Sequence, residues 1–350
     1  MTIKNVRHLP PLRIELSRTE RKHLILTGRN GSGKTSVLET LKQILVDQPI
    51  SGQVVLGLGQ DSYIDFNLPR KELDTKLENL TVQVFFPAKR GAEFQEPSGV
   101  QTAPYSGTFF LQHLVNLKAN RSFARDEGDE LGAEKIDRWF AQFEDSLRDL
   151  MDEPGLKLEF DRKNFTFRIV QPGRKPYSLN QLSDGYSAVL SIVTELMMRM
   201  AQPAPEVYDA QGIVLIDEIE THLHIALQKK ILPFLTRFFP HIQFIVSTHS
   251  PFVLTSLPNA VVYDLEQQVQ VEDLSRYSSE AVVEGYFNMD KYSDSLKEEV
   301  AAYERLSQLP ARSPEEQARY EALRASFREL LNFDELIVKI QQIELSSIRP

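Results

Sequence analysis

Hydrophobic residues run without polar alternation at residues 24–26, 213–216 and 244–246. Such runs predict strands that are buried on both faces, as in a parallel sheet covered by helices. Residues 12–16 and 156–170 alternate between apolar and polar instead, which predicts a half-buried strand and a β-hairpin. Residues 261–265 predict one further strand, at the outer side of the sheet.

Between these strands, apolar residues return at the spacing of a helix over residues 37–45, 136–150, 189–197 and 225–238. The last segment contains Pro233, which we expect to kink or shorten its helix. Residues 53–56, 62–66 and 80–86 predict short strands punctuated by Gly, Asn and Pro, and we assign them to an antiparallel β part attached to the core. The pattern as a whole predicts an α/β fold.

The composition changes along the chain and suggests three regions. Residues 1–90 and 156–270 form the predicted α/β core, and residues 91–155 form a helical lobe inserted into it. Residues 275–350 are polar and predict helices at 294–309, 314–331 and 334–345, with sixteen acidic and ten basic residues from 271 to 350. This C-terminal region is either a solvated helical tail or a platform on which a partner protein docks.

Composition and charge exclude several classes of protein. The hydrophobic content of 41% and charged content of 25% are those of a globular chain, and the net charge of −9 argues against a protein that coats nucleic acid or membranes. There is no cysteine, so disulfides and thiolate metal sites are excluded. Without a secretion signal or a run of about 18 apolar residues, we expect a cytoplasmic protein.

Residues 28–35 follow the first buried strand, open a helix and read G-x-x-x-x-G-K-T, the pattern of a phosphate-binding loop. Its glycines allow successive N–H groups to point inward at a helix N-terminus, which makes a nest for anions. Lys34 is expected to reach the β- and γ-phosphates of a nucleotide, and the Thr35 hydroxyl to ligate Mg²⁺. The predicted phosphate-binding residues are Asn30, Gly31, Ser32, Gly33, Lys34, Thr35 and Ser36.

Two further buried strands end in polar residues that can serve a nucleotide. Asp217 and Glu218 leave the strand at 213–216, and residues 247–250 (Ser-Thr-His-Ser) leave the strand at 244–246. Ligands of open α/β sheets bind at the carboxyl ends of strands, so these groups and the phosphate loop are expected at one edge. Ser183 and Gly185 stand just before a long helix, a common helix start that carries little information alone.

These motifs, in this order, resemble an ABC-type ATPase head of the RecF, SMC and OLD group over residues 1–270. Residues 182–186 of this chain resemble the ABC signature of such heads. Residues 220–224 resemble their D-loop in its E-x-H-L-H form. The resemblance implies ATP and Mg²⁺ as ligands, with Thr35 and Asp217 holding the metal. It also implies that Glu218 polarises the attacking water and that His249 senses the γ-phosphate. Ser183 and Gly185 would contact that phosphate from a second copy in an ATP-dependent, head-to-tail homodimer.

The chain is also similar to bacterial ATPases predicted to be involved in virulence and to ATPase subunits of Septu and retron-linked antiphage systems. Residues 85–90 and 185–186 suit that group. Gln83 and Gln95 are the candidates for the glutamine of the Q-loop, and no aromatic residue for adenine stacking stands near the N-terminus. Lys89 and Arg90 either face phosphates or belong to a solvated turn. The His222 and His224 pair is explained by the D-loop better than by a metal site.

The leading hypothesis is an ATPase that controls a separate effector, such as a nuclease, in antiphage defence, with no membrane partner. The alternative is a DNA-repair or chromosome-maintenance head that clamps DNA itself, through the basic first fifty residues or through Lys118, Arg121 and Arg125. A transporter subunit is disfavoured by the D-loop and the inserted lobe. A GTPase is unsupported because no N-K-x-D motif occurs. A fused nuclease is unsupported because the C-terminal region is short and has no D-x-D pair.

Overall fold

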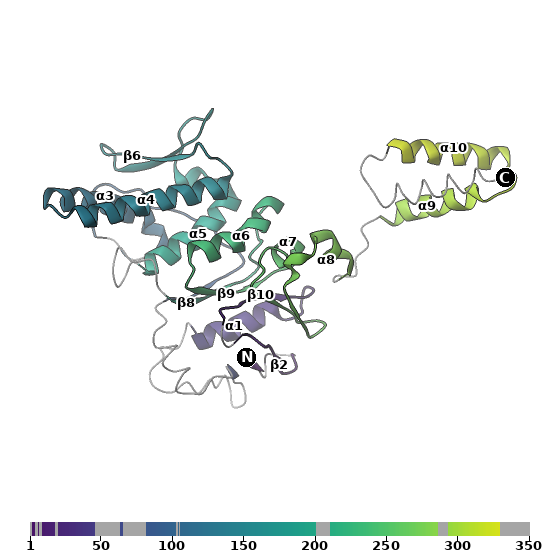
Figure 1. The fold of residues 1–350 in the computed structure, drawn as a ribbon, viewed down its shortest axis with the longest axis horizontal. Coiled ribbons are helices and arrows are strands. Elements are labelled where there is room, and N and C mark those ends of the chain that lie inside the picture. The colour runs from purple at the N-terminus through teal and green to yellow at the C-terminus, as the bar shows by residue number, and fades with distance from the viewer. Residues whose placement is uncertain are drawn as a thin grey trace. The chain divides into compact units, whose positions relative to one another are not determined.

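The computed structural model describes residues 2–3, 6, 9–17, 20–45, 64–65, 82–102, 104, 106–200, 211–285 and 293–329 (Figure 1). The strand predicted at 53–56 and the helix predicted at 334–345 lie outside the described residues. The chain separates into two compact units, residues 1–279 and residues 280–350, and each is described by itself.

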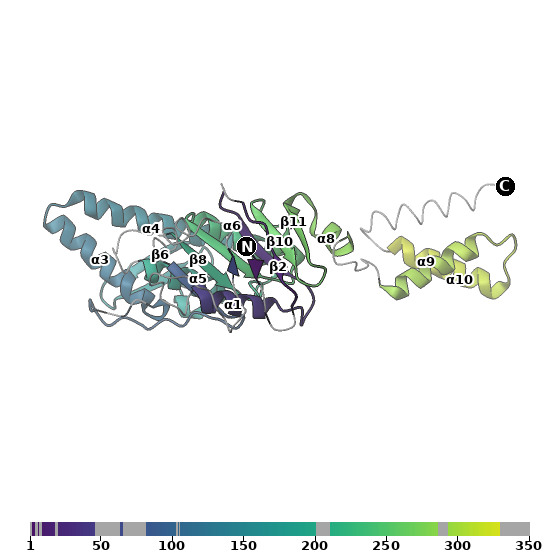
Figure 2. The same ribbon diagram turned by 90° about the horizontal axis from the view of Figure 1, so that it is seen from below.

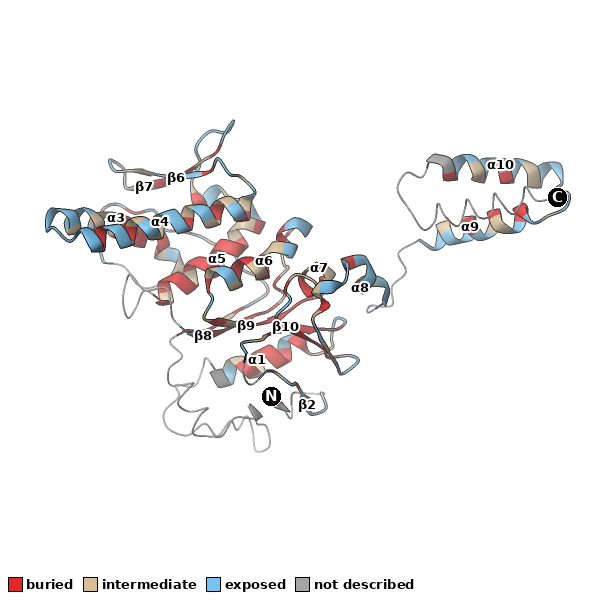
Figure 3. Ribbon diagram, in the orientation of Figure 1, coloured by how far each residue is buried: buried red, intermediate tan, exposed pale blue. Residues whose placement is uncertain are grey.

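A six-stranded sheet forms the centre of the first unit. All neighbouring strands in it are parallel except the outermost pair, β10 and β11. Strands β3, β8, β9 and β10 are buried along almost their whole length, as their apolar runs require (Figure 3). In spatial order the strands are β11 (Val269–Glu272), β10 (Ala260–Asp264), β3 (His23–Thr27), β9 (Ile242–Ser247), β8 (Gly212–Ile216) and β5 (Val82–Phe86).

Two strand assignments made from the sequence are wrong. The strand predicted at 80–86 is β5, which pairs in parallel with β8 in the central sheet rather than joining an antiparallel part. The strand predicted at 261–265 is β10, which is not the outer strand because β11 pairs with its free edge. In both cases the residues form a strand as predicted, and only the strand's neighbours differ.

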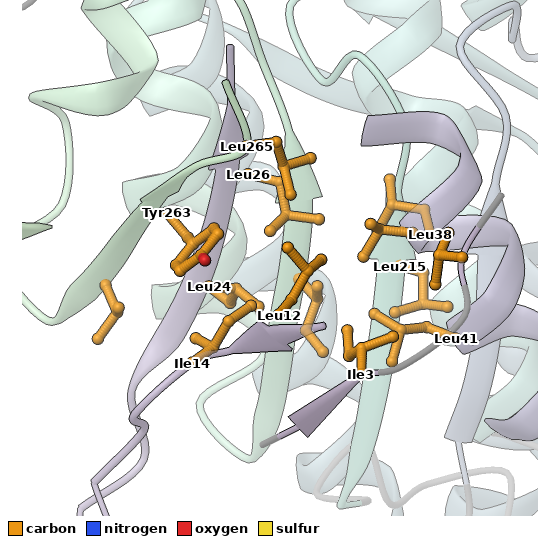
Figure 4. Close-up of a cluster of buried hydrophobic side chains, with 14 of the residues drawn as sticks. Ile3, Leu12, Ile14, Leu24, Leu26, Leu38, Leu41, Leu215, Tyr263 and Leu265 are labelled. Carbon is orange, nitrogen blue, oxygen red and sulfur yellow. The ribbon is translucent and has the colours of Figure 1, made fainter. Parts of the chain in front are cut away.

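A small antiparallel sheet packs beside the centre and completes the core. Its order is β2 (Leu12–Arg13), β1 (Thr2–Ile3) and β4 (Ile64–Asp65). The predicted alternation at 12–16 is confirmed, since Leu12 and Ile14 are buried while Arg13 and Glu15 are exposed. These apolar side chains meet those of the central sheet and the first helix in one cluster (Figure 4).

Helices cover both faces of the central sheet. Helix α1 (Lys34–Leu45) lies on one face, and helices α5 (Asp184–Met200) and α6 (Ile225–Phe238) lie on the other (Figure 1). Pro233 does not end α6, which continues to Phe238. The short helix α7 (Pro251–Leu254) follows β9, and its first turn is capped by the Ser250 hydroxyl. One edge of the sheet therefore carries the starts of α1 and α7.

A helical lobe is formed by η1 (Gly107–Phe109), α3 (Phe110–Asp126) and α4 (Glu130–Met151), with α3 and α4 side by side (Figure 2). The predicted hairpin is β6 (Lys157–Asp161) and β7 (Thr166–Val170), and it packs on this lobe with Phe140 stacked on Phe167 at 6.1 Å. The aromatic stripe of α4 is thus packing, as expected. Helix α5 follows η2 (Leu179–Gln181).

The C-terminal unit is helical where it is described. Helix α8 (Ser279–Gly285) begins at the boundary after η3 (Leu274–Arg276), and α9 (Asp294–Ser307) and α10 (Pro314–Glu329) form a pair. The pair has its own core, in which the rings of Tyr303 and Tyr320 stack at 5.0 Å. Among the described residues of the chain, no helix is long and apolar enough to span a membrane.

Candidate active site

The phosphate loop joins β3 to α1 and has the backbone that its glycines were expected to provide. Gly28, Gly31 and Gly33 have φ angles of 126°, 83° and 96°, a region that other residues rarely adopt. A side chain at Gly28 would also lie 2.8 Å from the Ser32 hydroxyl oxygen. The loop runs directly into the N-terminus of α1, so its N–H groups and the helix start form one anion-binding concavity.

Lys34 is the first residue of α1, and its ammonium group is turned back over the loop. Its Nζ donates to the carbonyl oxygens of Gly28 at 2.8 Å and Arg29 at 3.0 Å. Burial lowers the pKa of Lys34 from its ordinary value, and the carboxylates of Glu218 and Asp217 oppose that shift. A buried cation whose hydrogen bonds, among the described residues, go to loop carbonyls is suited to meet an anion that enters the loop.

Asp217 connects three of the predicted motifs through its two carboxylate oxygens. The Thr35 hydroxyl donates to Oδ2 at 3.0 Å, and the Ser247 hydroxyl donates to Oδ1 at 2.5 Å. Asp217 is buried, and its backbone N–H donates to the Phe86 carbonyl, which continues the pairing of β8 with β5. The structure therefore brings the two predicted metal ligands, Thr35 and Asp217, into direct contact.

Glu218 lies at the point where the chain turns after β8. Its φ of 44° is uncommon for a residue with a side chain, so this backbone conformation must be held by its surroundings. Its N–H donates to the Ser247 hydroxyl at 2.8 Å, and the Thr221 hydroxyl donates to its Oε2 at 3.3 Å. Glu218 is half-buried, and its carboxylate interacts with the ammonium group of Lys34 and raises the pKa of that group against the effect of burial.

His249 lies at the carboxyl end of β9, and its backbone is tied to the turn after β8. Its N–H donates to Glu220 Oε1 at 2.5 Å, while the other oxygen of Glu220 is buried without a hydrogen-bond partner among the described residues. Burial lowers the pKa of the His249 imidazole, and nearby Lys34 adds to this shift against the opposing carboxylates. His249 is therefore mainly neutral at pH 7, able to donate from one ring nitrogen.

Among the described residues, Ser183 and Gly185 have no hydrogen bond to Thr35, Asp217 or Glu218. Ser183 is exposed just before α5, and Gly185 is in the first turn of that helix, where N–H groups lack partners within the helix. A side chain at Gly185 would lie 3.1 Å from the His222 carbonyl oxygen and 3.2 Å from Leu227. Glycine is thus needed here to let α5 approach the segment between β8 and α6.

Arg90 is the residue that sequence reasoning missed. We expected Lys89 and Arg90 either to face phosphates or to lie in a solvated turn; Lys89 is exposed, whereas the Arg90 guanidinium is turned into the protein. It donates to the carbonyl oxygens of Asp217, Glu218 and Ile219. Burial lowers the pKa of Arg90 to about 10, against the opposing effect of nearby carboxylates led by Glu220, so the group stays charged at neutral pH.

The two Q-loop candidates lie away from the edge where the site forms. Gln83 is inside β5, opposite Ile213, and Gln95 is exposed beyond Arg90, with its N–H bonded to the Thr108 carbonyl. His222 and His224 are exposed, and the His224 ring meets Tyr186 at 6.3 Å. Among the described residues no group of three or more His, Cys, Asp or Glu side chains is placed to hold a metal.

The residues present fit a nucleoside triphosphate with Mg²⁺. The hydroxyl of Thr35 and the carboxylate of Asp217 are hard oxygen donors, which Mg²⁺ prefers in partial coordination completed by phosphate and water. The Ser32 hydroxyl is buried in the loop without a hydrogen-bond partner among the described residues. A Cβ at Gly31 would meet nothing within 4 Å, so the loop is open at that point.

Comparison with known proteins agrees with this geometry. Residues 63–255, more than half of the chain, match the family described as "AAA domain, putative AbiEii toxin, Type IV TA system". The chain belongs to this family. With its phosphate loop and its mainly parallel sheet, it is an α/β P-loop ATPase.

Curated relatives of this AAA-domain protein share shorter or more divergent stretches. It is 46% identical over 79 residues to the Septu protein PtuA of Bacillus mycoides (strain KBAB4), a match covering 23% of this chain and 11% of that protein. It is 25% identical to the retron Vc95 probable ATPase of Vibrio cholerae serotype O1 biovar El Tor, covering 70% and 69%. It is 38% identical over 101 residues to the retron Ec83 probable ATPase of Escherichia coli, covering 28% and 19%.

Among solved structures, similar chains include heads of SMC proteins. The SMC head bound to the C-winged helix domain of ScpA is similar with a TM-score of 0.45 and 13% identity, covering 79% of this chain and 97% of that chain. The SMC head domain from Thermotoga maritima has a TM-score of 0.38 and 15% identity, covering 75% and 92%.

Proposed function

We propose that this ATPase domain hydrolyses ATP in composite sites between two copies arranged head to tail, and that the cycle controls a separate effector. The observation that carries the hydrolytic part is the Asp217 carboxylate, held between the hydroxyls of Thr35 and Ser247 with Glu218 as its neighbour. A metal ligand, a phosphate-loop hydroxyl and a candidate general base therefore share one edge of the sheet.

Within one copy, the loop N–H groups and Lys34 hold the β- and γ-phosphates, while Thr35 and Asp217 hold Mg²⁺. The bound ion supplies positive charge that offsets the charge of the phosphates. Phosphoryl transfer needs little covalent chemistry from the protein, so positioned charges and hydrogen bonds provide most of the catalysis. The short bond from Ser247 keeps one oxygen of Asp217 in place and leaves the other for the metal.

Glu218 polarises the attacking water, and His249 donates a hydrogen bond to the γ-phosphate. The role of Glu218 is supported by its position directly after the proposed metal ligand Asp217 and by the hydroxyl of Thr221, which donates to its carboxylate. The role of His249 is supported by its backbone bond to Glu220 and by the burial that keeps its imidazole neutral. Both residues leave strands that are adjacent in the sheet.

Ser183 and the Gly185 N–H serve the site of the other copy. Both lie at the start of α5, where the N–H groups of the first turn lack partners within the helix and can bind an anion. Ser183 is also exposed. Neither has a hydrogen bond to Thr35, Asp217 or Glu218 among those the structure gives. A head-to-tail dimer is the symmetric arrangement that places each signature against the partner's phosphate loop.

A mixing experiment tests the composite site. Ser183→Arg removes the contact in trans, and Lys34→Ala removes phosphate binding, so each variant alone is expected to be inactive. In a mixed dimer one site has both wild-type groups, and random pairing gives about one quarter of the wild-type turnover. Complete inactivity of the mixture, with mixed dimers demonstrated by differential tags, would refute sharing between copies.

The effector is proposed to be a protein such as a nuclease in antiphage defence. Similarity to the Septu protein and to the two retron probable ATPases supports that setting. The second unit, residues 280–350, supports a docking role because it contains none of the residues gathered around the phosphate loop. Deleting it is expected to spare ATP binding and to abolish recovery of the effector in pull-downs from the native host.

The second candidate, a head that binds DNA itself, is favoured by one observation at a place the sequence did not suggest. Six exposed cations lie between 157 and 176 against two acidic residues, and none forms an ion pair with another described residue. In contrast, Arg121 and Arg125 both pair with Asp137, and Lys118 lies 3.8 Å from the Phe140 ring centroid. The six are Lys157, Arg162, Lys163, Arg168, Arg174 and Lys175.

Gel-shift titrations separate the two candidates. The DNA-binding candidate expects salt-sensitive binding that Lys163→Glu with Arg168→Glu abolishes, while the equally charged control Lys135→Glu with Arg138→Glu on α4 preserves it. The effector candidate expects no binding at physiological salt for any of these proteins. Tight binding by the wild type, lost in the hairpin variant alone, would favour the DNA-binding head.

A further inference from the structure

Arg90 makes a set of contacts that no motif assigns to it. Its guanidinium donates to the carbonyl oxygens of Asp217 at 2.9 Å, Glu218 at 3.1 Å and Ile219 at 2.7 Å. Building on the proposed function, we propose that Arg90 is a positioning residue that sets the direction of the Glu218 carboxylate through the backbone. It does not touch the carboxylate itself in the contacts that the structure gives.

The geometry explains how contacts with carbonyls can aim a side chain. The carbonyls of Asp217 and Glu218 belong to the two peptide planes on either side of the Glu218 Cα. Because peptide units are planar, holding both planes fixes φ and ψ of Glu218, and with them the Cα–Cβ bond. The φ of 44° is one that a residue with a side chain rarely keeps unaided, so an external constraint is needed at this position.

The opposite side of the turn is held by β9. The Glu218 N–H donates to the Ser247 hydroxyl, and the Ile219 N–H donates to the Ser247 carbonyl at 3.0 Å. Arg90, from the loop after β5, holds the carbonyls, so the turn is clamped between the two strands that flank β8. Among the described residues, the side chain of Glu218 accepts one hydrogen bond, from the Thr221 hydroxyl at 3.3 Å. Its direction is therefore set mainly by the backbone clamp.

Arg90 is itself anchored, and its anchor leads to the signature segment. It donates to the carbonyls of Pro87 at 3.0 Å and Ala88 at 3.3 Å within its own loop. Just beyond it, the Ala92 N–H donates to the Ser187 hydroxyl at 2.9 Å, and that hydroxyl donates to the Ala92 carbonyl. The loop therefore connects the turn at residues 217–219 to α5, the helix that begins next to Ser183.

The chemistry of arginine suits this role better than that of lysine. A planar guanidinium presents several donors in fixed directions, whereas an ammonium is a point charge that cannot bridge three successive carbonyls with the same geometry. Arg90→Lys keeps the charge and most of the side-chain volume but loses the planar arrangement of N–H donors. It is therefore the variant that separates alignment of Glu218 from simple charge.

The test measures turnover and ATP affinity for Arg90→Lys in the full chain. We expect kcat to fall about 100-fold, as for a misplaced catalytic group, while the dissociation constant for ATP with Mg²⁺ stays unchanged. The matched control is Lys89→Gln, a neighbouring exposed cation, which should keep kcat within about twofold of the wild type. In a Glu218→Gln background, Arg90→Lys should cause no further loss, because the group that it aligns is already gone.

Two results would overturn the proposal. One is wild-type turnover by Arg90→Lys. The other is that Arg90→Lys lowers the residual turnover of Glu218→Gln by the same factor as it lowers wild-type turnover, which indicates a role unrelated to Glu218. If Arg90→Lys does not fold, Ser187→Ala takes its place, since it loosens the anchored loop, and its loss must also vanish in that background. If Glu218→Gln turns ATP over at the wild-type rate, the proposed function itself is refuted. If Glu218→Gln is inactive and Arg90→Lys turns ATP over at the wild-type rate, only this inference is refuted.

Discussion

At the scale of single residues, the site depends on hydroxyl groups that hold the carboxylates in place. Ser247 is fully buried, donates to Asp217 at 2.5 Å and accepts from the Glu218 N–H at 2.8 Å. It therefore fixes both the proposed metal ligand and the proposed general base. The resemblance placed Ser247 in the loop that carries His249, but gave it no role of its own.

We expect Ser247→Ala to raise the Mg²⁺ concentration needed for half-maximal ATPase activity by about 10- to 100-fold, the usual effect of losing a partner of a metal ligand. The reason is that one oxygen of Asp217 and the Glu218 N–H both lose their buried partner. A Mg²⁺ titration of turnover measures the shift. Ser191→Ala on α5, whose hydroxyl bonds only the Ala188 carbonyl, is the control; an unchanged Mg²⁺ requirement in Ser247→Ala would contradict the role.

The sequence was informative where a motif prescribes side-chain chemistry. Lys34, Thr35 and Asp217 were placed together because each residue type is needed at a fixed position relative to a strand end. Arg90 was not, because its partners are backbone carbonyls, which every residue has and no pattern reveals. Gly185 is a similar case, since its need for close packing depends on the His222 carbonyl that the fold brings near.

At the scale of elements, the pairing of β3 with β9 includes a buried histidine. His23 accepts the Phe244 N–H on Nδ1 at 3.1 Å, and burial, with a smaller effect of Arg21, lowers its pKa to about 4. Folded His23 therefore stays neutral where the unfolded chain takes up a proton. Its contribution to stability is complete above pH 6.5 and is lost as the pH falls from 6.5 toward 4.

Between pH 6.5 and pH 5 we expect this residue to remove about 1.5 kcal/mol from the free energy of unfolding. His23→Asn can still accept the Phe244 N–H but does not titrate, so its stability should fall less over the same interval. Urea titrations at the two pH values measure the difference. The exposed His222→Asn should behave like the wild type, and identical pH dependence of His23→Asn and wild type would exclude His23 as the cause.

The positions of strands and helices along the chain were largely predictable from the sequence, whereas the pairing partners of the strands were not. The alternation in β5 reflects a strand at the edge of the sheet, with alternate residues buried and half-buried, and this pattern does not reveal whether the partner is parallel. The outer position of β10 was wrong because β11 has exposed and half-buried residues that give no strong strand signal. Pro233 did not shorten α6, because buried residues on either side hold the helix.

At the scale of the whole molecule, the proposed reaction requires two copies of the chain. The groups around Asp217 and the signature residue Ser183 lie in the same unit and share no hydrogen bond among the described residues, and the proposed site takes Ser183 from a second copy. The predicted domain bounds, the dimer and the effector remain proposals that sequence and fold support. The central claim among them is that ATP joins two copies before it is hydrolysed.

The measurement that tests this claim most directly is the molar mass of Glu218→Gln by light scattering, with ATP and Mg²⁺ or with ADP. The chain has a mass of 40.1 kDa, so a dimer has 2 × 40.1 = 80.2 kDa. We predict the dimer mass with ATP and the monomer mass with ADP, because Glu218→Gln is expected to bind ATP without turning it over. Lys34→Ala should remain monomeric with either nucleotide. A Glu218→Gln protein that binds ATP and stays at 40.1 kDa would contradict the account.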